Sequence, residues 1–263
     1  MPIGKWYCVN PYFYPMRIYP LSEGNFSIDS TKVFIPYATS HGEQNRPTGS
    51  IIVQVQPFVV VTEKDIILLD TGLGYFNHQG LLQIHANLMA IGIDPSSVTK
   101  VFLSHLHKDH SGGISFLHPQ HQERFISFPY ATYYIQKSEY DWALQSKSAS
   151  YIADQIQILE EFSKVHWLTQ DEGVIEDILH YKITGGHSLY HQVCWIKEQA
   201  EILFFGADVA PQLQHMKSRF VAKYDLEGKL AMEWRQQWWE KGQLENWTFA
   251  FYHDIKVPTY KAM

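Results

Sequence analysis

Short apolar runs that end in polar residues recur along the chain, and each run predicts a buried strand. The segment SIIVQVQPFVVVTEKDIILLDTG (50–72) predicts two β-branched strands separated by a Thr-Glu-Lys-Asp turn. The second of these strands, residues 66–69, is apolar throughout, as expected for a strand that is covered on both faces. Further apolar runs that predict strands occupy residues 100–104, 181–188, 201–208 and 247–254.

Helical spacing of apolar residues appears between these runs. Apolar positions recur every three or four residues in 80–91, 151–162 and about 228–241, as on one face of a helix. Strands followed by helices, twice over, predict an α/β fold in which polar residues gather at strand ends, where open α/β sheets bind ligands. No repeat or linker divides the sequence, so we expect a single domain over residues 1–263.

Composition and charge narrow the class of function. A net charge of −6 without any basic run argues against a nucleic-acid-binding surface. Cys8 and Cys194 are too few for a secreted disulfide scaffold, and we expect both to be free buried thiols. The start of the chain, MPIGKWYC, lacks the features of a signal peptide, and no apolar run approaches membrane-spanning length. We therefore expect a cytoplasmic protein that acts on a small molecule, with no nucleic-acid or membrane partner.

Three histidines and an aspartate directly follow the predicted strand at 100–104. In the stretch SHLHKDHSGG they are His105, His107, Asp109 and His110. Residues two apart in an extended segment point the same way, so His105 and His107 can converge on one ion. Asp109 and His110 come after a turn and face another direction, which favours two adjacent ions over one. The two glycines that follow let the loop fold closely around a metal.

More candidate ligands lie at the ends of other predicted strands. His187 follows a Gly-Gly turn, Asp208 follows the run that begins at residue 201, and His253 ends the last run. Asp70 ends the strand at 66–69. Taken singly, each histidine also fits a structural role and each aspartate a helix N-cap. Together with the cluster they provide imidazole and carboxylate ligands for two divalent ions, which suits zinc, with iron or manganese as alternatives.

The order of these residues resembles that of the metallo-β-lactamase-fold hydrolase superfamily. The resemblance implies a four-layer αββα sandwich, with two mixed sheets flanked by helices and the metals at one edge. It implies a first metal on His105, His107 and His187, and a second metal on Asp109, His110 and His253. Asp208 would bridge the two metals. Asp70 would orient the ligand loop through hydrogen bonds, as metal ligands generally require.

Within the superfamily the chain is most similar to the lactonase-type and esterase-type members, the acyl-homoserine lactonases among them. The motifs that carry this similarity are SHLHKDHSGG, TGGHSLYHQ and FAFYHD. Those lactonases place a tyrosine three residues after the bridging aspartate, where it assists the substrate carbonyl, whereas this chain has Pro211. Candidates to replace that tyrosine are Tyr190, Tyr224 and Tyr252. The resemblance also implies a homodimer, and a cap over the metal edge from an insertion at about 118–165.

The predicted function is that of a metal-dependent hydrolase that cleaves a lactone, an ester or a thioester with a hydroxide bridging the two metals. Asp109, beside that hydroxide, is the catalytic residue expected to take and return a proton. The alternatives are a small-molecule phosphodiesterase, a mononuclear iron persulfide dioxygenase, and a non-catalytic binding protein. Two aromatic segments, 7–20 and 231–242, form either the wall of an apolar acyl-binding cleft or core and dimer contacts.

Overall fold

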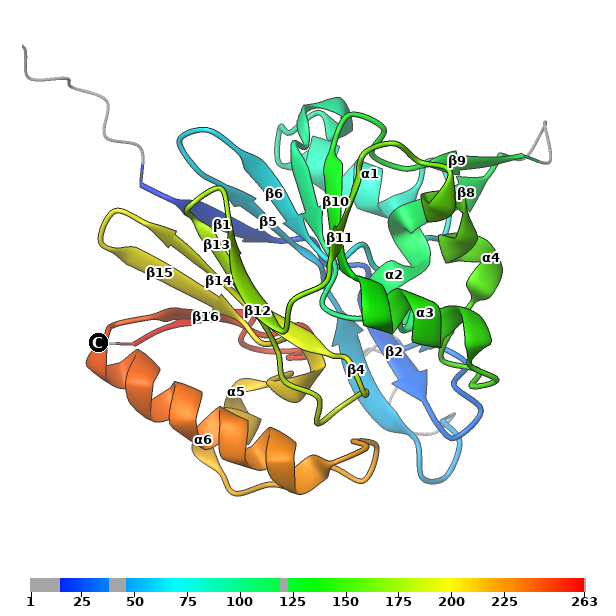
Figure 1. Cartoon of the computed structure of the whole chain (residues 1–263). Coiled ribbons are helices and arrows are strands. Elements are labelled where there is room, and N and C mark those ends of the chain that lie inside the picture. Colours follow the sequence, from blue (N-terminus) through cyan, green and yellow to red (C-terminus); the bar gives the residue numbers. More distant parts are fainter. Residues whose placement is uncertain (1–14, 38–45, 119–122, 263) are drawn as a thin grey trace, which may run out of the picture.

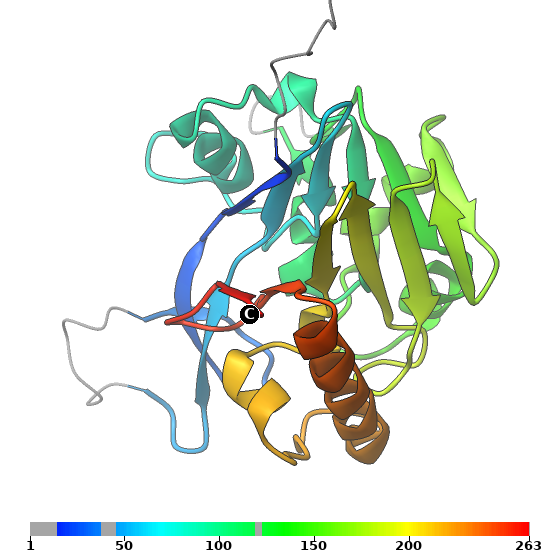
Figure 2. The same ribbon diagram turned by 90° about the vertical axis from the view of Figure 1, so that its left-hand side faces the viewer.

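Two β-sheets packed face to face form the centre of the protein (Figure 1, Figure 2). The computed structural model describes residues 15–37, 46–118 and 123–262. Within these residues each of the two sheets has six strands, and both sheets contain parallel and antiparallel pairs. Helices cover the outer face of each sheet, which makes four layers. The α/β class and the αββα sandwich are therefore confirmed.

The first sheet has the strand order β1-β5-β6-β7-β10-β11. Its strands are β1 (Arg17–Pro20), β5 (Phe58–Val61), β6 (Ile66–Leu69), β7 (Lys100–Phe102), β10 (Thr132–Gln136) and β11 (Val165–Leu168). The second sheet contains, in spatial order, β12 (Glu172–Ile175), β13 (Leu179–Ile183), β14 (Gln192–Glu198), β15 (Glu201–Phe205), β16 (Thr248–Ala250) and β17 (Thr259–Lys261). A three-stranded sheet joins β3 (Ile35–Pro36), β2 (Gly24–Ile28) and β4 (Ile51–Val55), and β8 (Ser115–Leu117) pairs with β9 (Arg124–Ile126).

The helices lie between and after these strands. The α-helices are α1 (Gln83–Ala90), α2 (Lys108–Ser111), α3 (Lys137–Gln145), α4 (Ala153–Ile156), α5 (Leu213–Lys217) and α6 (Gly228–Leu244). Short 3₁₀ helices occupy η3 (Pro95–Ser97), η4 (Gly112–Ile114), η5 (Gln157–Glu160) and η6 (Ala207–Val209). The helix predicted at 80–91 is shorter than expected, and the one predicted at 151–162 is divided into α4 and η5.

Strand β6 shows why the central strands are apolar on both faces. Ile67 and Leu69 belong to the cluster between the two sheets, which also contains Phe205 of β15. Leu68 points to the opposite side and packs with Ile84 of α1. Successive side chains of a strand alternate between faces, so a strand in the middle of four layers needs apolar residues at every position.

The aromatic segment 231–242 lies in α6 and belongs to the core. Trp238 is buried, stacks on Trp234 with ring centroids 5.5 Å apart, and lies 4.9 Å from the ring of Phe204 on the second sheet. The alternative that this segment forms the wall of a substrate cleft is wrong, because its indole rings cover the outer face of the sheet. Residues 7–14 of the other aromatic segment, with Cys8, lie outside the described residues, and Cys194 is buried and free.

The apolar segment at 50–72 forms three strands, whereas two were predicted. Its first half is divided at Pro57 into β4, which joins the three-stranded sheet, and β5, which joins the first sheet. Proline has no N–H to donate to a neighbouring strand, so the run cannot continue through it as a central strand. The segment at about 118–165 contributes β10 to the middle of the first sheet. Its role as a cap, and the single-domain organisation, stay predictions.

The strands β6, β7, β13, β15 and β16 are among those that point their carboxyl ends at the same edge of the sandwich. Strands β6 and β7 are parallel neighbours in the first sheet, and β15 and β16 are parallel neighbours in the second. Strand β13 runs in the same direction as β15, because both are antiparallel to β14. The sheets are joined at this edge by Gln192, whose N–H and side-chain amide donate to Ser104 O and Leu103 O, at 2.9 and 2.8 Å. The residues that follow these strands therefore meet.

The buried carboxyl group of Glu23 supports the turn that follows β6. Glu23 Oε2 accepts a hydrogen bond of 2.7 Å from Leu73 N, and Tyr75 Oη donates to Glu23 O at 2.7 Å. Gly72 has a φ of 75°, a backbone conformation that other residues rarely adopt, and a Cβ there would lie 2.5 Å from the Glu23 carboxyl, so this position favours glycine. Burial raises the pKa of Glu23 to about 8, the Leu73 N–H opposes the rise, and the charge of Asp109 adds to it.

Glu23 should make the protein less stable as the pH rises from 4.5 to about 8. The unfolded chain releases this proton near the ordinary pKa of 4.5, whereas the folded protein keeps it up to about 8. Over that range the loss is at most about 5 kcal/mol, at about 1.4 kcal/mol per pKa unit. We expect Glu23→Gln to remove this slope in urea unfolding of the metal-free protein. Glu63→Gln, at an exposed position, is the control, and equal slopes in both variants would contradict the assignment.

Candidate metal centre

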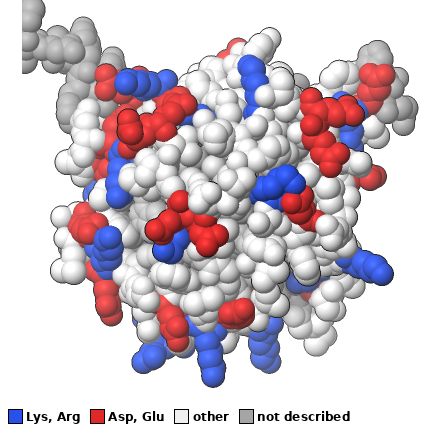
Figure 3. All heavy atoms as spheres, viewed as in Figure 1, with Lys and Arg blue, Asp and Glu red and all other residues white. Residues whose placement is uncertain are grey.

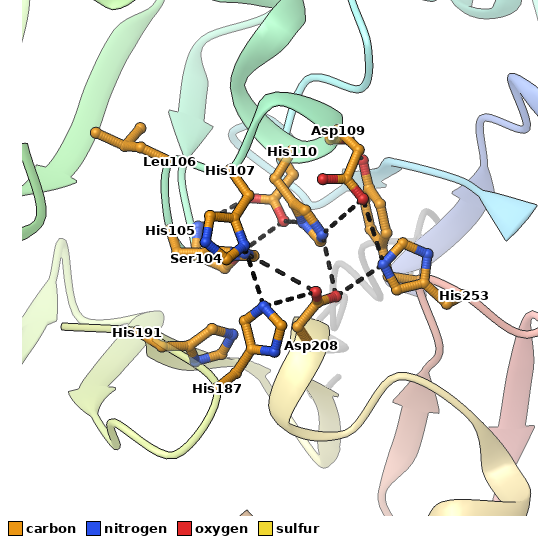
Figure 4. Close-up of polar contacts among 12 residues, drawn as sticks. Ser104, His105, Leu106, His107, Asp109, His110, His187, His191, Asp208 and His253 are labelled. Atoms are coloured by element: carbon orange, nitrogen blue, oxygen red, sulfur yellow. Dashed lines mark hydrogen bonds and ion pairs between the residues drawn. The ribbon is translucent and has the colours of Figure 1, made fainter. Parts of the chain in front are cut away.

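The seven side chains predicted as metal ligands lie together at this edge (Figure 4). Their ligand atoms form two groups, and within each group all atoms lie within 4.8 Å of one another. The first group contains His105, His107, His187 and Asp208, and the second contains Asp109, His110 and His253. In the first group the Nδ1 atom of His107 lies 3.0 Å from His105 Nε2 and 3.1 Å from His187 Nε2. All seven residues are buried or half-buried.

Asp208 has one carboxylate oxygen directed at the histidines of the first group and the other directed at the histidines of the second group. Its Oδ2 lies 3.1 Å from His187 Nε2 and 3.9 Å from His105 Nε2. Its Oδ1 lies 3.0 Å from His110 Nε2 and 2.9 Å from His253 Nε2. A carboxylate with one oxygen directed at each of two imidazole clusters is the arrangement that a bridging ligand needs.

Local structure explains how the HLHKDH stretch serves both groups. His105 and His107 are two residues apart in the extended chain that follows β7, and both belong to the first group. Asp109 and His110 lie in the short helix α2, which turns them to the second group. Thr71 N and Oγ1 both donate to His110 O, at 2.7 and 3.0 Å, and so join this helix to the end of β6. Gly113 is required at the end of the motif because a Cβ there would lie 2.1 Å from Thr71 O.

Asp70 joins the two ends of the ligand loop. Its backbone is left-handed, with a φ of 59°, and its carboxylate is completely buried. Oδ1 accepts from Ser104 N at 2.7 Å, and Oδ2 accepts from Ser104 Oγ at 2.7 Å and lies 2.7 Å from His110 Nδ1. These contacts are those expected of a residue that orients metal-binding side chains.

Two further histidines have an acceptor at their outer nitrogen. His187 Nδ1 lies 3.0 Å from Asp225 Oδ1, and His253 Nδ1 lies 2.6 Å from Gln54 O. With His110, three imidazoles therefore have Nδ1 paired outside the centre and direct Nε2 at Asp208, at 2.9–3.1 Å. Without a cation between them this spacing requires a protonated Nε2 that donates to the carboxylate, whereas a neutral Nε2 is a metal ligand. The donor set therefore fits divalent metal ions.

The pKa shifts of the buried groups differ between the two sets of histidines. Burial, aided by neighbouring histidines, lowers the pKa of His105 and of His107 well below the ordinary value, which keeps both neutral and able to bind metal. Burial alone would lower the pKa of His110, but the charges of Asp208 and Asp109 raise it well above the ordinary value. Burial opposes ionisation of Asp208, but the nearby His110, His253 and His187 hold its pKa well below the usual range. The carboxylates thus favour positive charge at the centre.

Two acidic residues near the centre were not identified from the sequence. Asp225 orients His187 from 38 residues away in an irregular segment, where no periodicity marks it. Glu139 lies in the first turn of α3, where an acid is ordinarily explained by the helix dipole. Its Oε1 accepts from Leu106 N at 3.0 Å and from Tyr151 Oη at 3.3 Å, and its pKa is raised by burial. Glu139 thereby holds the ligand loop against the wall of the neighbouring cavity.

A cavity of about 1220 Å³ opens next to the predicted ligands. Its floor includes His107, Asp109, His187, Asp208 and His253. Its walls come from the β2–β4 sheet, from the loop between α3 and α4, and from the segment that leads into α6. Apolar side chains in these walls are Ile28, Phe34, Ile51, Trp142, Leu189, Phe220 and Leu226. Part of the predicted cap segment, from Trp142 to Tyr151, therefore contributes to the wall.

The candidate tyrosines differ in their position relative to this cavity. Tyr252 is completely buried, stacks on His110 at 4.0 Å and donates to Asp109 O at 2.5 Å, so it supports the centre from behind. Tyr190 is not among the residues that line the cavity, whereas Tyr224 lines it with its ring 6.0 Å from that of His187. Tyr151, which sequence reasoning missed, also lines the cavity, with its ring 4.8 Å from that of His107.

Comparison with known proteins identifies the family. The model of the metallo-β-lactamase superfamily matches residues 52–253, so the chain belongs to this superfamily, a class of metal-dependent hydrolases. An N-acyl homoserine lactonase, AttM, of Rhizobium radiobacter is 30% identical over 146 residues, which are 50% of this chain and 49% of the relative. The AttM lactonase of Rhizobium johnstonii is 28% identical over 144 residues, 49% of this chain and 48% of the relative. The chain thus spans about half the length of the curated relatives it matches.

Solved structures show the same fold along nearly the whole chain. A probable metal-dependent hydrolase from Staphylococcus aureus superposes with a TM-score of 0.72 at 19% identity, over 94% of this chain and 92% of that one. AidC, a dizinc quorum-quenching lactonase in complex with a product, superposes with a TM-score of 0.68 at 20% identity, over 93% and 89% of the two chains. The predicted resemblance to lactonase-type members of the superfamily is therefore confirmed.

The surface carries mixed charge. On the face shown in Figure 3, Lys and Arg side chains lie scattered among Asp and Glu side chains. In the described part of the chain, no helix has both the length and the apolar character needed to cross a membrane.

Asp225 provides a test of the centre that leaves all seven candidate ligands in place. Asp225→Asn removes the charge that orients His187, and we expect metal affinity to fall about 10- to 100-fold. Competition with a chelator measures this loss. Asp154→Asn, at an exposed position outside the cavity, is the matched control. Equal affinity in the two variants would show that the His187–Asp225 contact does not support metal binding.

Proposed function

We propose that this protein is a dinuclear metal hydrolase, with zinc as its metal, that cleaves a lactone, an ester or a thioester. The observation that carries the proposal is the position of Asp208, whose two oxygens face two separate groups of imidazole nitrogens. Imidazole and carboxylate ligands suit zinc, with iron or manganese as alternatives. The curated relatives are N-acyl homoserine lactonases, which supports carbonyl hydrolysis.

Each group of ligand atoms would hold one ion. The first ion would be held by His105, His107 and His187, and the second by Asp109, His110 and His253. Asp208 would bind both ions. When bound, such ions supply a water that ionises near neutral pH and an electrophile for the carbonyl oxygen. Asp70 and Asp225 keep the imidazoles of His110 and His187 in the orientation that this binding requires.

Asp109 is the residue that we assign to proton transfer. Its Oδ2 lies 3.5 Å from His253 Nε2 and 3.7 Å from His110 Nε2, which are longer distances than those of Asp208 to the same atoms. Asp109 also lines the cavity, so its carboxylate faces both the centre and a bound substrate. It can therefore take a proton from the attacking water and return it to the leaving oxygen.

Tyr224 is the tyrosine best placed to assist the substrate carbonyl where the lactonases use the position of Pro211. It lines the cavity with its ring 6.0 Å from that of His187, whereas Tyr252 and Tyr190 do not line it, and the hydroxyl of Tyr151 donates to Glu139. Partial desolvation and the charge of Asp225 raise the pKa of Tyr224, which keeps its phenol protonated and able to donate a hydrogen bond.

A second candidate function is hydrolysis of a small phosphodiester, because a two-metal centre also serves phosphoryl transfer. The persulfide dioxygenase alternative is less well supported. Members of that kind lack several ligands of the second metal, whereas here Asp109, His110 and His253 lie together. The cytoplasmic location and the homodimer stay predictions.

Metal analysis followed by a substrate panel tests the proposal. We expect two zinc ions per chain in the purified protein, and loss of hydrolysis when a chelator removes them. The panel contains a lactone, a thioester and a bis-phosphoester, and we expect turnover of the first two. One iron per chain would favour the dioxygenase, and turnover of the bis-phosphoester alone would favour the phosphodiesterase.

The role of Asp109 has a separate test. Asp109→Asn removes the proton acceptor, and we expect turnover to fall on the order of 10²- to 10⁴-fold. His107→Ala, which removes a ligand of the first group, should lower turnover at least as much and should also lower metal content. Asp154→Asn is the control. An Asp109→Asn protein with two metals per chain and nearly full activity would exclude the assignment.

A further inference from the structure

Three lysines line the cavity next to the candidate metal centre. Lys32 lies between β2 and β3, Lys108 lies in the ligand loop between His107 and Asp109, and Lys223 precedes Tyr224. Lys32 and Lys108 are half-buried, and Lys32 lies close enough for its charge to act on both Lys108 and His107. Two positive charges thus face one apolar cavity from different elements of the fold.

Neither Lys32 nor Lys108 has a negatively charged partner in the described part of the chain. None of the ion pairs between described residues includes either of them or Lys223. Elsewhere in the described chain, each lysine that is buried or half-buried has a partner, whereas the lysines without an ion pair are exposed. The buried and half-buried ones are Lys100 with Asp65 and Glu176, Lys137 with Asp141, and Lys182 with Glu172. When a lysine loses water on partial burial, an anion ordinarily compensates its charge. The half-buried cavity lysines lack such an anion, and a bound molecule can supply it.

The acidic residues that line the cavity are committed to other contacts. Asp29 accepts hydrogen bonds from Thr31 N and Oγ1, at 2.9 and 2.6 Å, within its own turn. Asp225 faces His187, and Asp109 and Asp208 belong to the metal centre. Although the charge of Asp109 acts on Lys108, none of these carboxylates forms an ion pair with Lys32, Lys108 or Lys223.

We propose that the substrate is an ester or lactone that carries an anionic group, a carboxylate or a phosphate, which Lys32 and Lys108 bind while the scissile carbonyl lies at the metal centre. This inference rests on the proposed function, since it assigns a substrate class to the same site. The apolar walls hold the chain between the two polar ends, and Lys223 at the exposed rim adds to the attraction. The substrate class thereby differs from that of an uncharged acyl chain.

The charge of the cavity favours such a substrate through attraction at short range. Unpaired cationic side chains in a cleft with apolar walls raise the local concentration of an anionic ligand, and salt weakens the effect. Lys108 lies between two candidate ligands in the sequence, and its side chain lines the same cavity as they do. Lys32 contributes from the segment between β2 and β3.

The experiment compares matched aryl esters with the metal-replete full-length protein. One acyl chain ends in a carboxylate, one in a phosphate monoester, and the reference ends in an isopropyl group of similar shape. We expect kcat/KM for at least one anionic ester to exceed that for the reference by about 10-fold at low salt, and the ratio to fall as salt is added. The anionic ester with the larger ratio identifies the headgroup.

Lysine variants separate the effect of the lysines from that of the metals. Lys32→Met and Lys108→Met should each lower the ratio several-fold, and Lys32→Glu should lower it further. Lys64→Met, an equal loss of charge at an exposed position outside the cavity, should leave the ratio unchanged. The ratio uses the reference ester measured on the same variant, so a general loss of activity does not alter it.

The outcomes distinguish this inference from the proposed function. If the wild-type protein with two metals hydrolyses none of the esters and neither the lactone nor the thioester of the panel, the proposed function fails. If it hydrolyses only the lactone or the thioester, hydrolysis stands and the anionic ester class is overturned. If it hydrolyses the isopropyl ester as well as both anionic esters, or if Lys32→Met and Lys108→Met keep the ratio of Lys64→Met, hydrolysis stands and the anionic substrate class is overturned.

Discussion

The carboxylate of Asp208 holds the candidate centre together, because it is the only group of the seven that faces both sets of imidazole nitrogens in the described structure. Several surrounding contacts support this arrangement. Asp70 and Asp225 fix the outer nitrogens of His110 and His187, so that the inner nitrogens face Asp208. A buried carboxylate needs compensating positive charge, and the two groups of imidazole and carboxylate ligands around Asp208 fit metal ions that supply it.

The β-sandwich brings these side chains together at one edge. Parallel neighbours in each sheet direct their carboxyl ends at one edge, and the four layers bury the strands that lead there. Polar residues at the strand ends are thereby placed in a small volume, while the apolar residues before them remain in the core. Gln192 joins the two sheets at this edge, which keeps ligands contributed by different sheets in register.

The cavity shows how one fold supports different substrates. The candidate metal centre occupies its floor, whereas its walls come from the β2–β4 sheet and from segments outside the two central sheets. Lys108 illustrates the distinction: its neighbours on both sides are candidate ligands, but its own side chain faces the cavity. A residue within the ligand motif can therefore vary in charge without changing the ligand set, and we assign substrate selectivity to such positions.

The sequence alone determined the strand ends and the residues placed on them. Apolar runs predicted β6, β7 and β15, and the short-range pattern from His105 to His110 predicted the ligands, because both signals are local. Pro57 is visible in the sequence, but the sequence does not show that β4 before it and β5 after it belong to different sheets, because strand pairing is decided by the tertiary structure. Only the tertiary structure shows the contacts of Asp225 and Glu139 near the centre. It also shows that Lys32 and Lys108 line the same cavity. These residues come together from positions far apart along the chain, and no periodicity or spacing in a sequence encodes contacts across that distance.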